Sequence, residues 1–223
     1  MQHSRYIAAI EEAGWSVLNL PEEPHLPDSV FVEDTAIILS ELAVMTRPGA
    51  ETRRPEVNSI RHALANYMPT KDISDSAILD GGDVLVAGKH IFVGLSSRSD
   101  ANGAAELAAI AKPLGYSLET IAVKACLHLK SAVTSVGDHT LLYNPKWVRA
   151  DAFEGFSMIP VHPNEPSAGN CVDLDGVLLH GEAFPKTRAV LEDAGFSVAA
   201  APMDELAKAE GAATCCSLLL QST

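Results

Sequence analysis

A unit of about forty to fifty residues recurs along this chain, and the repeat constrains the fold more than any other feature of the sequence. Each copy has a polar residue, a short β-rich run, a tight turn, a second apolar run and a loop. In three of the four copies a clear amphipathic helix and another short strand follow. The copies begin close to Asp28, Asp83, His128 and Asn170. This ββαβ order predicts an α/β fold made of several pseudo-symmetric units.

Glycines mark the ends of the predicted elements. Residues 102–114 and 186–194 have apolar residues at three- and four-residue spacing, which predicts two helices. Each helix is followed by a glycine, Gly115 or Gly195, that can adopt the left-handed conformation typical of a helix end. Tight turns between strands are predicted at two pairs of residues, Ala87-Gly88 and Asp175-Gly176.

The two ends of the chain each resemble part of a unit. Residues 2–20 predict the helix and the last strand of a unit, and residues 214–220 predict the first strand of one. Joined, they supply most of a further copy, with one strand missing. The period alone fits a ring or a stack, but ends that share a unit favour a closed ring of five units. We expect one domain over residues 1–223, with an open sheet edge that favours aggregation or a homodimer.

Acidic residues outnumber basic ones, with 29 Asp and Glu against 16 Lys and Arg. Nucleic acids and anionic membranes bind basic surfaces, so neither is expected as a partner. A cationic small molecule fits this charge better. No run of about 18 uncharged apolar residues could cross a bilayer, and the first ten residues lack the apolar segment of a signal peptide.

The cysteines have neither a paired CxxC spacing nor the density of a disulfide framework. They are Cys126, Cys171, Cys215 and Cys216. Because disulfides form in oxidising compartments, this usage favours the reducing cytoplasm. We expect no bound metal and no other cofactor.

Polar residues that open the units would meet at the centre of such a ring. There Cys215 offers a thiolate nucleophile, and His128 titrates near neutral pH and can move protons. Asp28 and Asp83 add carboxylates, which bind a planar guanidinium through paired hydrogen bonds. Lys130 and Asn170 occupy the same kind of position. The group predicts nucleophilic chemistry on a cationic substrate.

Each of these residues also has a plainer explanation. A cysteine near the end of a chain is most often a small buried apolar residue, and His128 lies in an apolar LHL run where structural histidines are common. Asp28 and Asp34 fit turn or cap positions, and GGD at 81–83 fits a turn. Only their recurrence at equivalent positions of the repeat favours a shared site.

Seven segments give a more specific indication. They are PDSVFVEDTA, TRPGAETRR, LDGGDVL, FVGLSSRS, CLHLKSAV, PNEPSAGNCV and EGAATCCSL. In this order and spacing, from His3 to Leu220, the chain resembles the dimethylarginine dimethylaminohydrolase family of the pentein group of guanidino-modifying enzymes. The resemblance implies a five-bladed α/β propeller that hydrolyses N(omega)-methylated arginines to citrulline through a covalent cysteine intermediate.

The resemblance also implies a role for individual residues. Cys215 resembles the nucleophile, His128 the general acid and base, and Asp80 the carboxylate that orients the histidine. The residues that would hold the substrate are Asp28, Glu33 and Asp34 at the guanidinium, Arg53 and Arg98 at the α-carboxylate, and the backbone of Ala209 at the amino group.

This chain departs from the family pattern at its amino terminus. Family members normally begin earlier, with a strand and a loop that caps the substrate, whereas this chain starts at the following helix. Two alternatives stay open on these grounds. One is an arginine deiminase-like hydrolase of another guanidino compound, and the other is a propeller that binds a guanidino ligand without catalysis.

Overall fold

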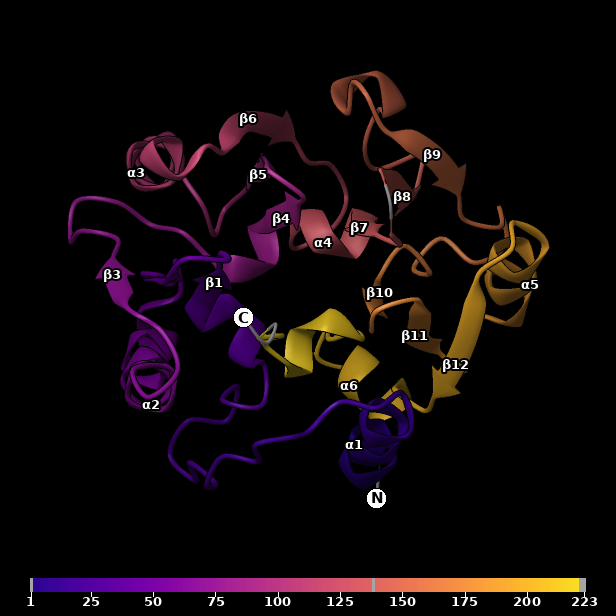
Figure 1. The fold of residues 1–223 in the computed structure, drawn as a ribbon, viewed down its shortest axis with the longest axis horizontal. Helices are drawn as coiled ribbons and strands as arrows, with labels where there is room; N and C mark the ends of the chain where they lie inside the picture. The colour runs from indigo at the N-terminus through magenta and orange to yellow at the C-terminus, as the bar shows by residue number, and fades with distance from the viewer. Residues whose placement is uncertain (1, 138, 221–223) are drawn as a thin grey trace. The chain divides into compact units, whose positions relative to one another are not determined.

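The computed structural model describes residues 2–137 and 139–220 (Figure 1). It contains four three-stranded sheets, each made of strands consecutive in sequence. In every sheet the first two strands pair antiparallel and the last two pair parallel. A parallel pair needs a crossover connection, which places the helix or loop between the second and third strands. The predicted ββαβ repeat is therefore confirmed.

The chain divides into two compact units, one formed by Met1–Pro21 and Lys130–Thr214 and the other by Glu22–Leu129 and Cys215–Thr223. The second unit contains two of the sheets. One has β1 (Ala36–Ile38), β2 (Ala43–Met45) and β3 (Thr70–Asp72), with α2 (Val57–Leu64) as its crossover. The other has β4 (Val84–Ala87), β5 (His90–Leu95) and β6 (Ser117–Ala122), with α3 (Ala101–Ala111) as its crossover. Short 3-10 turns lie at η1 (Val32–Thr35), η2 (Glu51–Glu56), η3 (Gly81–Asp83) and η4 (Lys112–Leu114).

The first unit repeats the plan. Its sheets are β7 (Val133–Ser135), β8 (Thr140–Tyr143) and β9 (Ser157–Pro160), then β10 (Cys171–Asp173), β11 (Val177–Gly181) and β12 (Ser197–Ala201). The crossover in the latter sheet is α5 (Pro185–Asp193), whereas η5 (Ala150–Ala152) is the only regular helical turn between β8 and β9. The remaining helices are α1 (Gln2–Glu12), which contacts β12, α4 (Leu129–Ala132) and α6 (Asp204–Ala207). The last 3-10 turn is η6 (Thr214–Cys216).

Apolar side chains between sheet and crossover helix hold each unit together. In the second unit Leu107 of α3 is fully buried against Leu79 and Val93. In the first, Leu191 of α5 is buried against Leu178 of β11. Burying one such side chain stabilises the fold by about 1.5–3 kcal/mol.

Both predicted helices and both predicted turns are present. The helix expected over 102–114 is α3 continued by η4, and Gly115 follows with a φ of 84°. The Asp175-Gly176 turn has positive φ at both residues, 55° and 100°, which matches the twist of an antiparallel hairpin.

The strands expected in residues 2–20 and 214–220 are wrong for the residues that the structure describes. Residues 2–12 form the predicted helix, but no strand follows it before Pro21, and residues 217–220 form none. An extended segment becomes a strand only when a neighbour takes its backbone hydrogen bonds, and neither segment has a strand partner among the described residues.

Candidate active site

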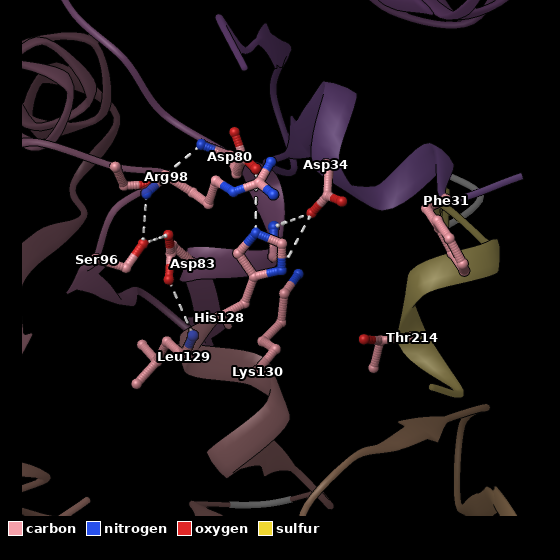
Figure 2. A network of polar contacts seen from close by, with 12 residues as sticks. Phe31, Asp34, Asp80, Asp83, Ser96, Arg98, His128, Leu129, Lys130 and Thr214 are labelled. Atoms are coloured by element: carbon pink, nitrogen blue, oxygen red, sulfur yellow. Dashed lines mark hydrogen bonds and ion pairs between the residues drawn. The ribbon is translucent and has the colours of Figure 1, made fainter. Parts of the chain in front are cut away.

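A buried histidine between two aspartates forms the centre of the candidate site (Figure 2). His128 Nε2 lies 3.1 Å from Asp80 Oδ2, and His128 Nδ1 lies 3.8 Å from Asp34 Oδ1. The histidine is 7% exposed, Asp80 is fully buried, and Asp34 is 5% exposed. The fixed partner of Nε2 leaves Nδ1 as the nitrogen that faces the carboxylate of Asp34. The sequence prediction that Asp80 accompanies His128 agrees with this arrangement.

Two glycines allow these groups to approach so closely. A Cβ on Gly81 would lie 2.0 Å from the carbonyl oxygen of Glu33, and a Cβ on Gly82 would lie 2.6 Å from both Asp34 Oδ1 and His128 Nδ1. The Gly82 N–H also donates to Asp34 Oδ1 at 2.9 Å. The GGD turn at η3 therefore belongs to the site, because only glycine leaves room for the two side chains.

Asp80 is itself held in place from two sides. Its Oδ1 accepts a hydrogen bond from the Gly49 N–H at 2.8 Å, and its own N–H donates to Ser99 Oγ at 3.0 Å. These two hydrogen bonds fix the orientation of Asp80 independently of its contact with His128. A carboxylate held in this way can keep an imidazole in one orientation during proton transfer.

The surroundings of His128 favour its protonated form. Burial by itself lowers the pKa of the imidazole, but the hydrogen bond that it donates to Asp80 and the charges of Asp34, Asp83 and Asp80 outweigh it, so the pKa is raised. A positively charged His128 can act as a general acid towards a leaving amine.

Arg53 lies against the segment from Asp28 to Asp34 and contacts it through its guanidinium. Its guanidinium forms an ion pair with Asp34 and with Glu56, and it donates to the carbonyls of Phe31 at 3.0 Å and Asp28 at 3.2 Å. Burial would lower the pKa of Arg53, but the hydrogen bond to Glu56 and the charge of Asp34 raise it. Arg53 is 6% exposed, so it holds the segment from Asp28 to Asp34 as a buried cation.

Three further residues expected at the substrate lie in the same unit with different exposures. Glu33 is buried, whereas Asp28 and Arg98 are partly exposed. Among the described residues the Arg98 guanidinium has no ion-pair partner, in contrast to that of Arg53. In Figure 2 the Arg98 side chain points towards the region around Asp80 and His128.

Two neighbouring cysteines lie near the end of the described chain. Cys215 and Cys216 lie in η6 and are both partly exposed as whole residues. The thiol of Cys216 is buried, and this burial together with the charges of Glu33 and Asp34 raises its pKa to about 12. The Cys216 sulfur therefore stays protonated at neutral pH and is a poor nucleophile.

Two sequence-predicted positions belong to the other unit. Ala209 is exposed just after α6, with its N–H donating to the Leu206 carbonyl at 3.0 Å. Asn170 is buried and binds Thr214 twice, through Nδ2 to Thr214 Oγ1 and from Thr214 N to Oδ1, each at 2.9 Å. Its Nδ2 also donates to the Lys130 carbonyl at 2.9 Å. Asn170 thus fixes the residue that precedes Cys215 in the chain.

The site also contains atoms that could bind a cation. Asp34, Asp80 and His128 each offer one ligand atom, and these atoms lie within 4.8 Å of one another. Carboxylate and imidazole ligands suit a divalent ion such as zinc. In this structure the same atoms are already used by hydrogen bonds and by the ion pair to Arg53.

Sequence reasoning did not assign a role to several residues that support this geometry. Glu56 is the main one, because it shares Arg53 with Asp34. Its position three residues after Arg53 in a run containing proline could have indicated that both face the same side of a helical turn. The contacts of Gly49 and Ser99 come from chain segments distant from Asp80 and have no local sequence pattern.

The fold is that of guanidino-modifying enzymes. An amidinotransferase from Microseira wollei, SxtG, matches it with a TM-score of 0.88 at 15% identity, over 99% of this chain and 84% of the other. At that identity the match concerns the fold alone. The structure of a Cys-to-Ser variant of DDAH from Pseudomonas aeruginosa, complexed with citrulline, matches with a TM-score of 0.89 at 29% identity. The match covers 96% of this chain and 85% of that one.

Sequence comparison narrows this class. The family profile described as "N,N dimethylarginine dimethylhydrolase, eukaryotic" matches residues 1–150. N(G),N(G)-dimethylarginine dimethylaminohydrolase of Streptomyces coelicolor is 36% identical over 99% of this chain and 85% of its own length. The protein of the same description from Pseudomonas aeruginosa is 32% identical over 97% of this chain and 86% of its own. This chain belongs to the dimethylarginine dimethylaminohydrolase family.

Within the residues that the structure describes, no helix is both long and apolar enough to cross a membrane.

Proposed function

We propose that this protein hydrolyses N(omega)-methylated arginines, asymmetric dimethylarginine and monomethylarginine, to citrulline and dimethylamine or methylamine. The observation that carries the proposal is the buried pair of His128 and Asp80 with Asp34 beside it, in a chain of this family. Relatives of similar fold are described in complex with citrulline and as an adduct with S-methyl-L-thiocitrulline, the latter at 30% identity and a TM-score of 0.92.

The substrate is held at both of its ends. We assign Asp28, Glu33 and Asp34 to the guanidinium, because carboxylates bind its planar N–H groups in pairs. Arg98 has a free guanidinium for the α-carboxylate among the described residues. Arg53 is assigned to the same carboxylate, and it has to exchange one of its present partners to reach it. The substrate's amino group is assigned to the backbone at Ala209.

In the first chemical step the sulfur of Cys215 attacks the central guanidinium carbon. A carbon–sulfur bond forms, and the bond from that carbon to the methylated nitrogen breaks. Protonated His128 gives its proton to the departing amine, which leaves as dimethylamine or methylamine. The product on the enzyme is a covalent thiouronium at Cys215. The raised pKa of His128 supports its role as the acid.

In the second step water replaces the sulfur. His128, now neutral, takes a proton from water while the oxygen bonds to the same carbon, and the carbon–sulfur bond then breaks. As the carbonyl of citrulline forms, the remaining hydroxyl proton passes to solvent, where the released amine can take it up; citrulline leaves and the Cys215 thiolate returns. The covalent intermediate avoids direct attack by neutral water on a resonance-stabilised cation.

We also propose that the four sheets and the two chain ends belong to one five-bladed α/β propeller that acts as a single catalytic domain. The common strand order in all four sheets and the match to amidinotransferase structures support this architecture. A single unfolding transition that is superimposable by circular dichroism and by fluorescence would support the single domain, and two separate transitions would contradict it.

The nucleophile is tested by exchanging each cysteine of the vicinal pair. Cys215→Ser should abolish citrulline formation from asymmetric dimethylarginine, whereas Cys216→Ser should largely preserve it, because the Cys216 thiol has a pKa of about 12. The trapped intermediate on Cys215 is detectable by mass spectrometry of quenched enzyme. Equal loss in both variants would refute the assignment. Unmethylated arginine serves as the comparison substrate, and release of citrulline from it alone would favour a deiminase.

A further inference from the structure

Asp83 is a fully buried carboxylate to which the reaction described above gives no role (Figure 2). It follows the two glycines of η3 and directly precedes β4. Burying a charge is costly unless hydrogen bonds satisfy it, so the partners of this carboxylate indicate why it is there. They come from two other segments of the unit formed by Glu22–Leu129 and Cys215–Thr223, the loop of residues 96–99 and the segment at Leu129.

One oxygen of Asp83 holds the segment of the acid/base residue. Asp83 Oδ1 accepts a hydrogen bond from the Leu129 N–H at 3.0 Å, and Leu129 directly follows His128. The fit is close on this side, because a Cβ on Gly94 would lie 2.9 Å from Asp83 Oδ1 and 2.8 Å from the Leu129 Cβ. A bond to the next backbone amide limits how far the His128 ring can move.

The other oxygen holds the loop of Arg98. Ser96 Oγ donates to Asp83 Oδ2 at 2.6 Å and accepts from the Arg98 N–H at 2.9 Å. The chain of bonds from Asp83 through Ser96 fixes the backbone from which the Arg98 guanidinium extends. The same carboxylate is therefore linked to both ends of the proposed substrate.

A third contact leads to Asp80. The Ser99 side chain lies close enough to Asp83 to lower the pKa of that carboxylate, and Ser99 Oγ accepts from the Asp80 N–H at 3.0 Å. Asp80 is the partner of His128. The three contacts of Asp83 converge on the acid/base residue, on its orienting carboxylate and on the loop of Arg98.

We propose that Asp83 is a positioning residue that fixes the positions of His128, Asp80 and Arg98 relative to one another. The acid/base group and the residue that binds the α-carboxylate then stay at a distance that matches the length of the substrate. This inference rests on the proposed function. Asp83 touches none of the reacting atoms in the proposed mechanism, so its effect is exerted through its neighbours.

Charge adds a second consequence. Asp34, Asp80 and Asp83 each raise the pKa of the His128 imidazole, and Lys130 is drawn beside it in Figure 2. Burial raises the pKa of Asp83 itself, while His128 and the hydrogen bonds from serine and backbone oppose that rise. Removing the Asp83 charge should therefore lower the pKa of His128 and move the alkaline limb of the kcat profile to lower pH.

The test compares Asp83→Asn with Ser96→Ala. Asp83→Asn should lower kcat by about tenfold to a hundredfold, because a displacement of the acid/base residue by nearly 1 Å has an effect of about this size. It should also raise KM. Ser96→Ala removes only the link to the Arg98 loop, so it should raise KM with little change in kcat. Ser96 is partly exposed, so this variant retains the fold even if Asp83→Asn does not.

Glu165→Gln is the matched control. Glu165 is also a buried carboxylate that accepts backbone N–H groups, from Lys186 at 3.0 Å and Thr187 at 2.7 Å, in the unit that lacks His128. It should lose thermal stability without a change in the pH profile or KM. If Asp83→Asn behaves like this control, with unchanged kcat, KM and pH profile, the positioning role is overturned.

The titration of His128 followed by NMR separates this inference from the proposed function, since it requires no turnover. A lower imidazole pKa in Asp83→Asn, in a protein whose wild type releases no citrulline from any methylated arginine, would support the coupling and refute the function. An unchanged pKa together with an unchanged KM in Ser96→Ala would refute the coupling while leaving the function intact.

Discussion

Adding a single methyl group at Gly82 should disable the site without unfolding the protein. In Gly82→Ala the new Cβ would lie 2.6 Å from His128 Nδ1 and 2.6 Å from Asp34 Oδ1. Ordinary contacts of a Cβ begin near 3.4 Å, so these atoms have to retreat by about 0.8 Å. A displacement of about 1 Å in a reacting group lowers the rate by about a hundredfold, so kcat should fall by one to two orders of magnitude.

The stability of this variant should fall much less than its activity. Overpacking of this kind costs about 1–3 kcal/mol. Gly88→Ala is the control, because Gly88 has a φ of 60° and no atom within 4 Å of the added Cβ. The left-handed conformation costs an alanine about 1–2 kcal/mol there, a similar destabilisation with no contact at the site.

The assay is citrulline release from asymmetric dimethylarginine, with kcat and KM measured beside the thermal midpoint for each variant. The expected result is similar midpoints for Gly82→Ala and Gly88→Ala but a large loss of kcat only in the former. If Gly82→Ala keeps a kcat within about twofold of wild type, then the backbone of η3 shifts to accommodate the methyl group. The close packing of Gly82 against Asp34 and His128 would then not control the chemistry.

Further outcomes follow from the electrostatics. Asp80→Asn should lower the pKa of His128. A raised imidazole pKa stabilises the folded protein at pH values below the pKa of the unfolded state, and this stability is lost as pH rises through the pKa of the folded state. The pH-dependent part of the unfolding free energy, measured from pH 6 to 9, should therefore shrink in the variant. Arg98→Ala should raise KM by about tenfold to a hundredfold with a smaller effect on kcat, and an unchanged KM would remove it from the α-carboxylate. Burial lowers the pKa of His180, whose Nδ1 has no partner among the described residues, so acidification should destabilise the fold below the unfolded pKa near 6.5. His180→Gln should reduce that pH dependence, and an unchanged profile would assign it to other groups.

The sequence alone determined the repeating unit and its local elements. Period, apolar spacing and turn residues are local properties, so the ββαβ order, the helix before Gly115 and the Asp175-Gly176 hairpin followed from them. Among the described residues, the strands expected beside the chain ends did not form, because strand formation depends on a neighbour that local sequence does not contain.

The candidate residues were also identified from the sequence, but on two different kinds of evidence. The recurrence of polar residues singled out Asp83 and His128, and the family resemblance supplied Asp34, Asp80 and Arg53. Which of them touch could not be deduced, because Asp34, Asp80 and His128 are separated by 46 and 48 residues in the chain.

Only the tertiary structure decided how these groups share their partners. It places Arg53 in ion pairs with Asp34 and Glu56, and leaves the Arg98 guanidinium without an ion pair among the described residues. It also makes Asp83 a link between three segments. The physical reason is that a buried charge must find its hydrogen bonds wherever the fold brings donors, and those donors are distant in sequence. Local pattern therefore determined which residues were available, and packing determined what each one does.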